Sequence, residues 1–190
     1  MNTWTRTTDA RAGATLNLLS WYRGDGAAEE AHRQAMLRLL AESADPFSRH
    51  QFDPGHFTAS ALVVAPATQR VLLIAHPTLG LWLQPGGHIE AQDSSAVEAA
   101  RREVVEETGV LVRLDAELFD VDVHEIPARQ SQPEHRHFDL RFLALVEGQP
   151  EAAGAEGVDA RWLSHDEAWR LTTDGSVRRM LAKARLARVL

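Results

Sequence analysis

Cysteine is absent from this sequence of 190 residues, and long apolar runs are absent as well. Without cysteine the chain has no disulfide, no thiolate nucleophile and no thiolate metal ligand. No apolar run approaches the ~18 residues that a membrane-spanning helix needs, and the segment Met1–Asp9 lacks the apolar core of a signal peptide. We therefore expect a cytoplasmic protein with no membrane partner.

Positive charge is also scarce, because 27 acidic residues outnumber 20 basic ones and leave a formal net charge of −7. Proteins that bind nucleic acid mainly through phosphate contacts are usually basic. A polymeric nucleic-acid partner is therefore not expected. A small phosphorylated substrate stays compatible with the acidic total, since a bound divalent cation can reverse the local field.

The first 52 residues differ from the rest in their pattern of apolar and charged residues. An apolar stretch at Leu16–Trp21 is followed by Gly24-Asp25-Gly26 and then by Ala27–Ser43, whose apolar residues recur at helical spacing among charges. This pattern predicts an N-terminal helical extension at residues 1–52, packed either on the main domain or on a partner subunit. In the second case the extension would join a homodimer.

Residues 53–190 alternate β-rich runs with few helices. Predicted strands cover residues 58–65, 71–75, 81–83, 110–126, 137–146 and 160–163, and predicted helices cover 96–108, 164–171 and 176–190. This order is typical of an α+β fold or of an α/β sandwich with a mixed sheet. The basic residues of the last predicted helix either contact an anionic surface or form a solvated face that complements the helix dipole.

Both ends of the predicted helix at residues 96–108 are marked in the sequence. Ser95 and Glu98 have the spacing of a capping box. Gly109 is placed to end the helix in a left-handed turn. The register of the side chains along this helix is therefore defined.

Three acidic side chains share one face of this helix. At about 100° per residue, Glu103, Glu106 and Glu107 fall within an arc of roughly 100°. Their mutual repulsion costs on the order of a few tenths of a kcal/mol per pair even in water, and bound divalent cations would remove that cost. Carboxylate oxygens without thiolate or imidazole favour a hard ion, Mg²⁺ or Mn²⁺, which also binds phosphate oxygens.

A glycine-rich turn precedes the helix, and together the two segments resemble the signature of the Nudix hydrolases, G-x5-E-x7-R-E-U-x-E-E-x-G-U with U apolar. The stretch Arg102-Glu103-Val104-Val105-Glu106-Glu107-Thr108-Gly109-Val110 matches every specified position of the second half, and Gly87 matches the opening glycine. The first half departs from the signature, since Asp93 stands in place of the glutamate and the interval to Arg102 is one residue longer. Asp93 and Glu90 are therefore alternative supporting partners for Arg102.

The resemblance implies the family's three-layer α/β/α sandwich over residues 53–190. It also implies Mg²⁺-dependent hydrolysis, with Mn²⁺ as a substitute, of a diphosphate linkage in a nucleoside-diphosphate-linked or nucleotide small molecule. It assigns Glu106 and Glu107 as metal ligands together with the main-chain carbonyl of Gly87. Glu103 would be a ligand or the general base, and Arg102 would hold a glutamate by a charge-assisted hydrogen bond. Arg102, Glu103 and Glu106 are therefore the predicted catalytic residues.

The nine histidines are a high count, and several gather in the later strands. On an extended strand His135, His137 and Asp139 share one face, and His124 could approach them across a hairpin. These residues could form a 2-His-1-carboxylate metal site or a solvated polar face. By the Nudix resemblance they would instead line the substrate cleft, where Asp139 or Glu134 could complete the metal site.

Other residues near the glycine-rich turn also have two interpretations. His88 follows the opening glycine and would either lie near the metal and substrate or point outward. Trp82 could stack on a nucleobase or pack in the core. His56, Thr58 and Ser60 alternate on the first predicted strand, whose face would open into the cleft or be solvated.

Two other functions are compatible with the same fold. An isomerase of prenyl diphosphates needs a cysteine in the family's known site, and this chain has none. A non-catalytic nucleotide-sensing domain would not need the whole carboxylate set. The complete pattern from Arg102 to Glu107 therefore favours the hydrolase.

Overall fold

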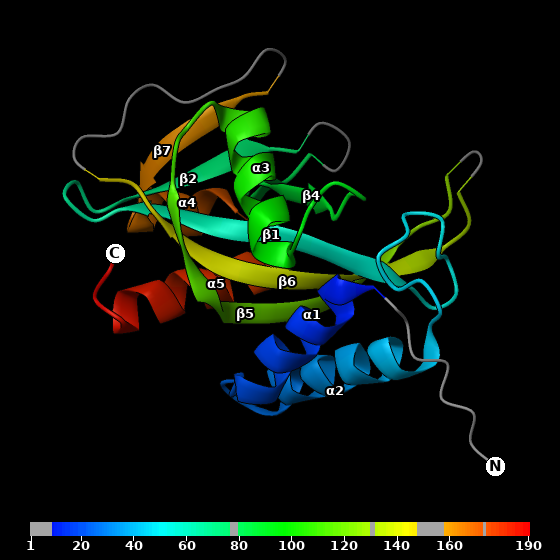
Figure 1. Ribbon diagram of the computed structural model, residues 1–190. Coiled ribbons are helices and arrows are strands. Elements are labelled where there is room, and N and C mark those ends of the chain that lie inside the picture. The colour runs from blue at the N-terminus through cyan, green and yellow to red at the C-terminus, as the bar shows by residue number, and fades with distance from the viewer. Residues whose placement is uncertain (1–8, 77–79, 130–131, 148–157, 173) are drawn as a thin grey trace.

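The computed structural model describes residues 9–76, 80–129, 132–147, 158–172 and 174–190. The first eight residues of the predicted extension lie outside the described residues. Figure 1 shows a central sheet with helices on both of its faces. The elements follow one another as α1 (Ala10–Trp21), α2 (Ala27–Glu42), β1 (Gly55–Ala65), β2 (Arg70–Ala75), β3 (Trp82–Leu83), β4 (Gly86–His88), α3 (Ala96–Thr108), β5 (Arg113–Ile126), β6 (His135–Leu145), β7 (Ala160–Ser164), α4 (His165–Leu171) and α5 (Gly175–Leu186).

The sheet is mixed. Its main path has the strand order β3-β2-β1-β6-β5, while β4 pairs with β1 and β7 pairs with β2. Strands β1 and β6 are parallel, with residues 55–64 facing residues 136–145, and the other paired strands are antiparallel. The structure thus confirms the predicted fold class, a mixed sheet sandwiched between helices.

Strand β1 has a buried residue at every position, and its side chains alternate between the two faces of the sheet. Ala59 and Val63 pack in one core cluster with Val104 of α3. Leu62 and Val64 pack in the other cluster, which is covered by α5. Because β1 supplies both cores, it fixes the position of α3 relative to the strands on either side.

Helix α3 begins and ends where the sequence predicts. The Ser95 hydroxyl accepts a hydrogen bond from the Glu98 N–H, and Gly109 has a φ of 71° in the left-handed region. The Glu98 side chain does not complete the capping box, because it forms an ion pair with Arg101 instead. The helix ends are therefore fixed by the serine hydroxyl and by the glycine.

The segment expected as a turn at Pro85-Gly86-Gly87 continues into the short strand β4, which pairs with residues 58–60 of β1. A Cβ at Gly86 would lie 2.3 Å from the Ser60 Cβ, a distance that real contacts do not reach. The glycine therefore serves a close approach of two strands, which local turn signals do not reveal.

The N-terminal helices pack on the chain's own sheet. Leu19 of α1 and Met36 of α2 belong to the same buried cluster as Val121 of β5 and Phe138 of β6. Figure 1 shows both helices beside β5. The helices of the extension therefore pack on the main domain, which is one of the two partners considered from the sequence. No helix in the described ranges is both long and apolar enough to cross a membrane.

Candidate active site

The three acidic residues Glu103, Glu106 and Glu107, here called the helix carboxylates, lie on α3 beside strand β4. The Gly86 N–H donates a hydrogen bond of 2.9 Å to the Glu107 carboxylate. A Cβ at Gly87 would lie 2.6 Å from a Glu103 carboxylate oxygen. The two glycines therefore allow two carboxylates to approach the main chain of β4 closely.

Negative charge at the helix carboxylates is held at a cost in free energy. Burial raises the pKa of Glu103. The Arg102 guanidinium opposes this rise, and the negative charge of Glu106 adds to it. Burial also raises the pKa of Glu107 to about 7, opposed by the Gly86 N–H and reinforced by Glu103 and Glu106. A cation placed against these oxygens would relieve both the burial cost and the mutual repulsion.

Arg102 is held by Asp93 rather than by Glu90. Its Nε and one terminal nitrogen donate to the two Asp93 oxygens at 3.0 and 2.9 Å. The same terminal nitrogen donates to the His88 carbonyl at 2.9 Å. Asp93 also accepts the Glu90 N–H at 2.8 Å, so Glu90 contributes its main chain and not its carboxylate. The longer loop before α3 therefore still delivers an acidic partner to the guanidinium.

The other terminal nitrogen of Arg102 is shared by two helix carboxylates. It lies 2.9 Å from a Glu103 oxygen and 2.9 Å from a Glu106 oxygen. The Glu106 side chain is 57% exposed, whereas Glu103 is 14% exposed. One guanidinium thus orients Glu103 and Glu106 but cannot neutralise them together with Asp93.

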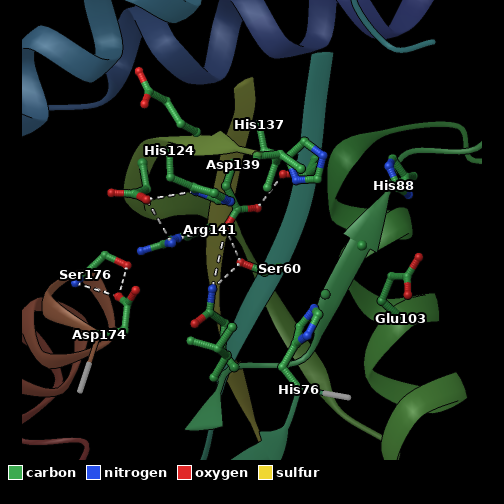
Figure 2. A pocket seen from close by; sticks show the side chains of 18 of the residues that line it. Ser60, His76, His88, Glu103, His124, His137, Asp139, Arg141, Asp174 and Ser176 are labelled. Carbon is green, nitrogen blue, oxygen red and sulfur yellow. Dashed lines mark hydrogen bonds and ion pairs between the residues drawn. The ribbon is translucent and has the colours of Figure 1, made fainter. Parts of the chain in front are cut away.

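A cleft of about 450 Å³ opens beside Glu103 and Glu107. Figure 2 shows His88 and Glu103 on one wall and Asp174 with Ser176 on the opposite wall. Seven residues predicted for the site line this cleft: Gly87, His88, Glu103, Glu107, His124, His137 and Asp139. The cleft therefore brings together residues from β4, α3, β5 and β6.

Asp139 lies at the base of the cleft with its oxygens already occupied by protein donors. Thr58 donates to it at 3.0 Å and Ser60 donates at 2.8 Å. The Arg141 Nε donates to the same carboxylate at 2.8 Å. The face of Thr58 and Ser60 therefore opens into the cleft, and the 2-His-1-carboxylate site considered from the sequence is not assembled around Asp139.

Histidines gather at one end of the cleft. The antiparallel pairing of β5 with β6 places His124 opposite His137, as the hairpin prediction required. Burial, together with the neighbouring histidines, lowers the pKa of His88 to about 4 and that of His137 to about 2. The ring of His135 packs on His56, with 5.3 Å between the ring centroids. Sequence spacing missed the approach of His56 to His137, because it depends on the parallel pairing of β1 with β6.

A family model described as the NUDIX domain matches residues 54–184 of this chain. The chain belongs to the Nudix family. It is similar, with 33% identity over 143 residues covering 74% of this chain and 84% of the relative, to the probable DHNTP pyrophosphohydrolase of Lactococcus lactis subsp. cremoris (strain MG1363). A putative 8-oxo-dGTP diphosphatase of Bacillus subtilis (strain 168) is 34% identical over 103 residues, covering 54% of this chain and 63% of the relative.

Solved structures share the Nudix fold. The E. coli dihydroneopterin triphosphate pyrophosphohydrolase superposes with a TM-score of 0.58 at 22% identity, covering 69% of this chain and 95% of the other. The NUDIX domain of Shewanella oneidensis NrtR, solved with ADP ribose, superposes with a TM-score of 0.52 at 21% identity, covering 80% of this chain and 97% of the other. The family match and the curated relatives show that this chain is a Nudix hydrolase, an enzyme that cleaves diphosphate linkages.

Not every residue singled out from the sequence reaches the Nudix cleft. Trp82 packs against the core cluster under α5, and the Arg161 guanidinium lies 4.6 Å from its ring centroid. The core interpretation of Trp82 therefore fits the structure better than stacking on a nucleobase. Glu134 is exposed, and neither it nor His135 is among the described residues that line the cleft.

A buried group of charges extends from the base of the Nudix cleft to α5, and Asp139 is its one member that the sequence predicted as a site residue. Lys183 of α5 donates to Glu29 of α2 at 2.6 Å and to Asp120 of β5 at 2.8 Å. Arg179 donates to Asp120 at 2.6 Å. Two basic residues of the last helix thus turn inward, unlike either interpretation of that helix. We call this group the ion-pair network; its members are Glu29, Asp120, Asp122, Asp139, Arg141, Arg179 and Lys183.

Proposed function

We propose that this Nudix hydrolase catalyses Mg²⁺-dependent hydrolysis of a diphosphate linkage in a nucleotide or in a small molecule linked to a nucleoside diphosphate. The observation that carries the proposal is the placement of Glu103 and Glu107. Both carboxylates are half-buried beside β4 at the edge of the cleft, and both have a raised pKa. Half-buried carboxylates that repel one another without full neutralisation are the arrangement that a divalent cation would stabilise.

The donor set fits the proposed metal. Nudix hydrolases generally use divalent metals. The helix carboxylates and the Gly87 carbonyl are oxygen donors, which Mg²⁺ and Mn²⁺ prefer. A Cβ at Gly87 would fill the space in front of Glu103. When bound, the metal would neutralise diphosphate charge and lower the pKa of a coordinated water.

Each side chain near that position has a proposed role. Glu103 is the proposed general base, because its half-buried carboxylate has a raised pKa and can hold a proton taken from an attacking water. Glu106 and Glu107 would serve as metal ligands. Arg102, fixed by Asp93, orients Glu103 and Glu106 through the two 2.9 Å contacts.

The proposed substrate class is a triphosphate that carries a fused-ring base or a related heterocycle. The relatives named above are a probable DHNTP pyrophosphohydrolase and a putative 8-oxo-dGTP diphosphatase. Both names refer to triphosphates. In the cleft, the imidazoles of His88, His124 and His137 offer polar contacts to such a molecule.

We also propose that the catalytic domain comprises residues 53–190 and that residues 1–52 form an N-terminal extension, whose described part from residue 9 onward belongs to the same folded unit. Shared burial of Leu19 and Met36 with the sheet supports this assignment. In the extension, Arg11 donates to the Glu90 carbonyl at 2.8 Å and so contacts the loop that leads into α3.

The test is a hydrolysis assay with and without Mg²⁺ on the wild type and on Glu107→Gln. The substrate panel contains dihydroneopterin triphosphate, 8-oxo-dGTP, the common nucleoside triphosphates, nucleotide sugars and dinucleoside polyphosphates, and products are assigned by mass. We expect Mg²⁺-dependent release of a diphosphate product and a loss of at least about 100-fold in Glu107→Gln. Glu98→Gln is the matched control, since Glu98 lies on the same helix and pairs with Arg101 outside the cleft.

The outcomes separate the proposal from its alternative. Turnover in Glu107→Gln equal to that of the wild type would remove the helix carboxylates from the mechanism. Tight binding of a nucleotide without cleavage of any compound in the panel would indicate a sensing role for this domain.

A further inference from the structure

Three histidines from three neighbouring strands of the sheet converge at one end of the cleft. His88 lies on β4, His56 on β1 and His137 on β6, and β1 pairs with both of the others. One ring nitrogen from each lies within 4.8 Å of the ring nitrogens of the other two. We propose that this histidine cluster binds a transition-metal ion of the Zn²⁺ class, with a ligand set separate from the helix carboxylates.

His56 has the hydrogen-bonding pattern of a metal ligand. Its side chain is fully buried, and its Nδ1 lies 3.0 Å from the Gln51 carbonyl. A carbonyl only accepts, so Nδ1 carries the proton and Nε2 keeps its lone pair. That Nε2 is buried and has no hydrogen-bond partner among the described residues. A metal-bound histidine usually donates its second ring N–H to a carbonyl or carboxylate in this way.

A bound ion would supply the missing partner of the His56 Nε2. Nearly all buried polar side-chain atoms in proteins have a hydrogen-bond partner. The rings of His88 and His137 lie next to that nitrogen, with centroids 5.1 and 4.9 Å from the His56 ring. Within the described chain neither ring takes part in a side-chain hydrogen bond. An ion shared by the three rings would satisfy all of them at once.

The chemistry of the three donors selects the ion. Imidazole nitrogens suit Zn²⁺, Cu²⁺, Ni²⁺ and Co²⁺, whereas Mg²⁺ prefers oxygen. In a tetrahedral site with Zn–N bonds of about 2.0–2.1 Å, the ligand nitrogens are about 3.4 Å apart. The distances of up to 4.8 Å in this cluster therefore close by small rotations of the half-buried His88 and His137 rings.

The fourth coordination position would open toward the cleft. His88 and His137 both line the cleft, whereas His56 lies behind them in the sheet. Three protein ligands with one open position are the arrangement of a zinc ion that accepts water or a ligand oxygen. In Figure 2 His88 and Glu103 project from neighbouring elements on the same wall. An ion at the histidine cluster would therefore face the same substrate as the helix carboxylates do.

The test is a Zn²⁺ titration of full-length protein prepared without a histidine tag, stripped of metal and held in millimolar Mg²⁺. Calorimetry and competition with a chromogenic chelator give the stoichiometry, and Co²⁺ absorption reports the coordination. We expect one Zn²⁺ per chain in the wild type and also in the triple variant Glu103→Gln, Glu106→Gln, Glu107→Gln. His137→Ala should weaken binding by more than the ~10–100-fold that loss of a supporting second-shell contact costs.

Two further variants keep the test decisive. His56→Gln removes the buried ligand, and His88→Ala serves if that variant does not fold. His165→Ala is the matched control, because His165 also has a buried Nε2 without a partner in the described chain but lies on α4, away from the cluster. Binding should survive in this control.

Two results would overturn the proposal: no Zn²⁺ bound by the wild type, or binding that persists in His137→Ala and His88→Ala but disappears in the triple glutamate variant. The second result would place Zn²⁺ at the helix carboxylates. Neither result bears on Mg²⁺-dependent turnover, so this proposal and the proposed hydrolase function fail separately.

Discussion

Two regions of this protein bury carboxylates, and they treat them in opposite ways. In the ion-pair network, Glu29 and Asp120 are fully buried, and each lies within ion-pair distance of both Arg179 and Lys183. At the helix carboxylates, one guanidinium serves Glu103, Glu106 and Asp93 together. The comparison shows where negative charge supports folding and where it is left available to a ligand.

The pKa values of the two regions differ in the same sense. Burial opposes the charge of Asp122, but the hydrogen bond with His124 and the nearby Arg141 and Arg179 outweigh it and lower the pKa. Burial opposes the charge of Glu107 too, and there it prevails and raises the pKa to about 7.

Stability should therefore respond to pH with opposite signs in the two regions. Because the pKa of Asp122 is lowered, this group contributes stability at pH values above its ordinary pKa of 3.8. That stability is lost as the pH falls below 3.8 toward the lowered pKa. A raised pKa at Glu107 means that stability is lost as the pH rises from 4.5 through about 7.

The largest expected effect on stability comes from removing a cation of the ion-pair network. Lys183→Met leaves Glu29 and Asp120 buried with one cation fewer, and removal of one partner from a buried pair costs about 3–5 kcal/mol. Urea unfolding at pH 7 measures the loss. Arg185→Met on the exposed side of the same helix is the control and should change little. A cost below about 1 kcal/mol for Lys183→Met would contradict the role given to this network.

The next effect concerns the partner of Arg102. Asp93→Asn weakens the two contacts that hold the guanidinium at 2.9–3.0 Å, so Glu103 and Glu106 lose their orientation. We expect kcat to fall about 10–100-fold, the range for a supporting contact near a metal site. Glu90→Gln is the matched control and should retain kcat, because only its main chain contacts Asp93. The reverse ranking of these two variants would restore Glu90 as the supporting acid.

The loop before α3, which carries Glu90 and Asp93, also shows what can and cannot be predicted from the sequence. The ends of α3 and the arc of the helix carboxylates followed from local signals, a serine cap, a glycine and a period of about 3.6 residues. The choice between Asp93 and Glu90 did not follow, because the path of an irregular loop sets which acid meets the guanidinium. Local rules therefore predicted the helix and its chemistry but not its support.

Contacts between distant strands were the other limit. The sequence singled out His56 and His137 separately, but their approach depends on the parallel register of β1 and β6. Lys183 and Glu29 are 154 residues apart, and their ion pair exists because α2 and α5 both pack near β5. Period and spacing carry no information on such pairings, which tertiary packing decides.

A smaller effect on stability, of the opposite sign, is expected at the helix carboxylates. In metal-free protein at pH 8, Glu107→Gln removes a charge that burial and Glu103 disfavour, and the neutral amide can still accept the Gly86 N–H. We expect a gain of about 1–2 kcal/mol, after allowance for partial solvation of the group. At pH 4 the gain should nearly vanish, because the wild-type carboxyl is then mostly protonated in both states. Thermal unfolding of both proteins at the two pH values measures this, and a loss of stability at pH 8 would contradict it.

The smallest effect should come from the ion-pair network when a neutral donor, rather than a cation, is removed. The Tyr22 hydroxyl donates to Glu29, which also accepts the Lys183 ammonium at 2.6 Å and the Asp25 N–H at 3.1 Å. Tyr22→Phe leaves those two donors in place, so we expect a cost of about 1 kcal/mol in urea unfolding at pH 7. A cost as large as that of Lys183→Met would mean that hydrogen bonding, and not charge compensation, keeps Glu29 buried.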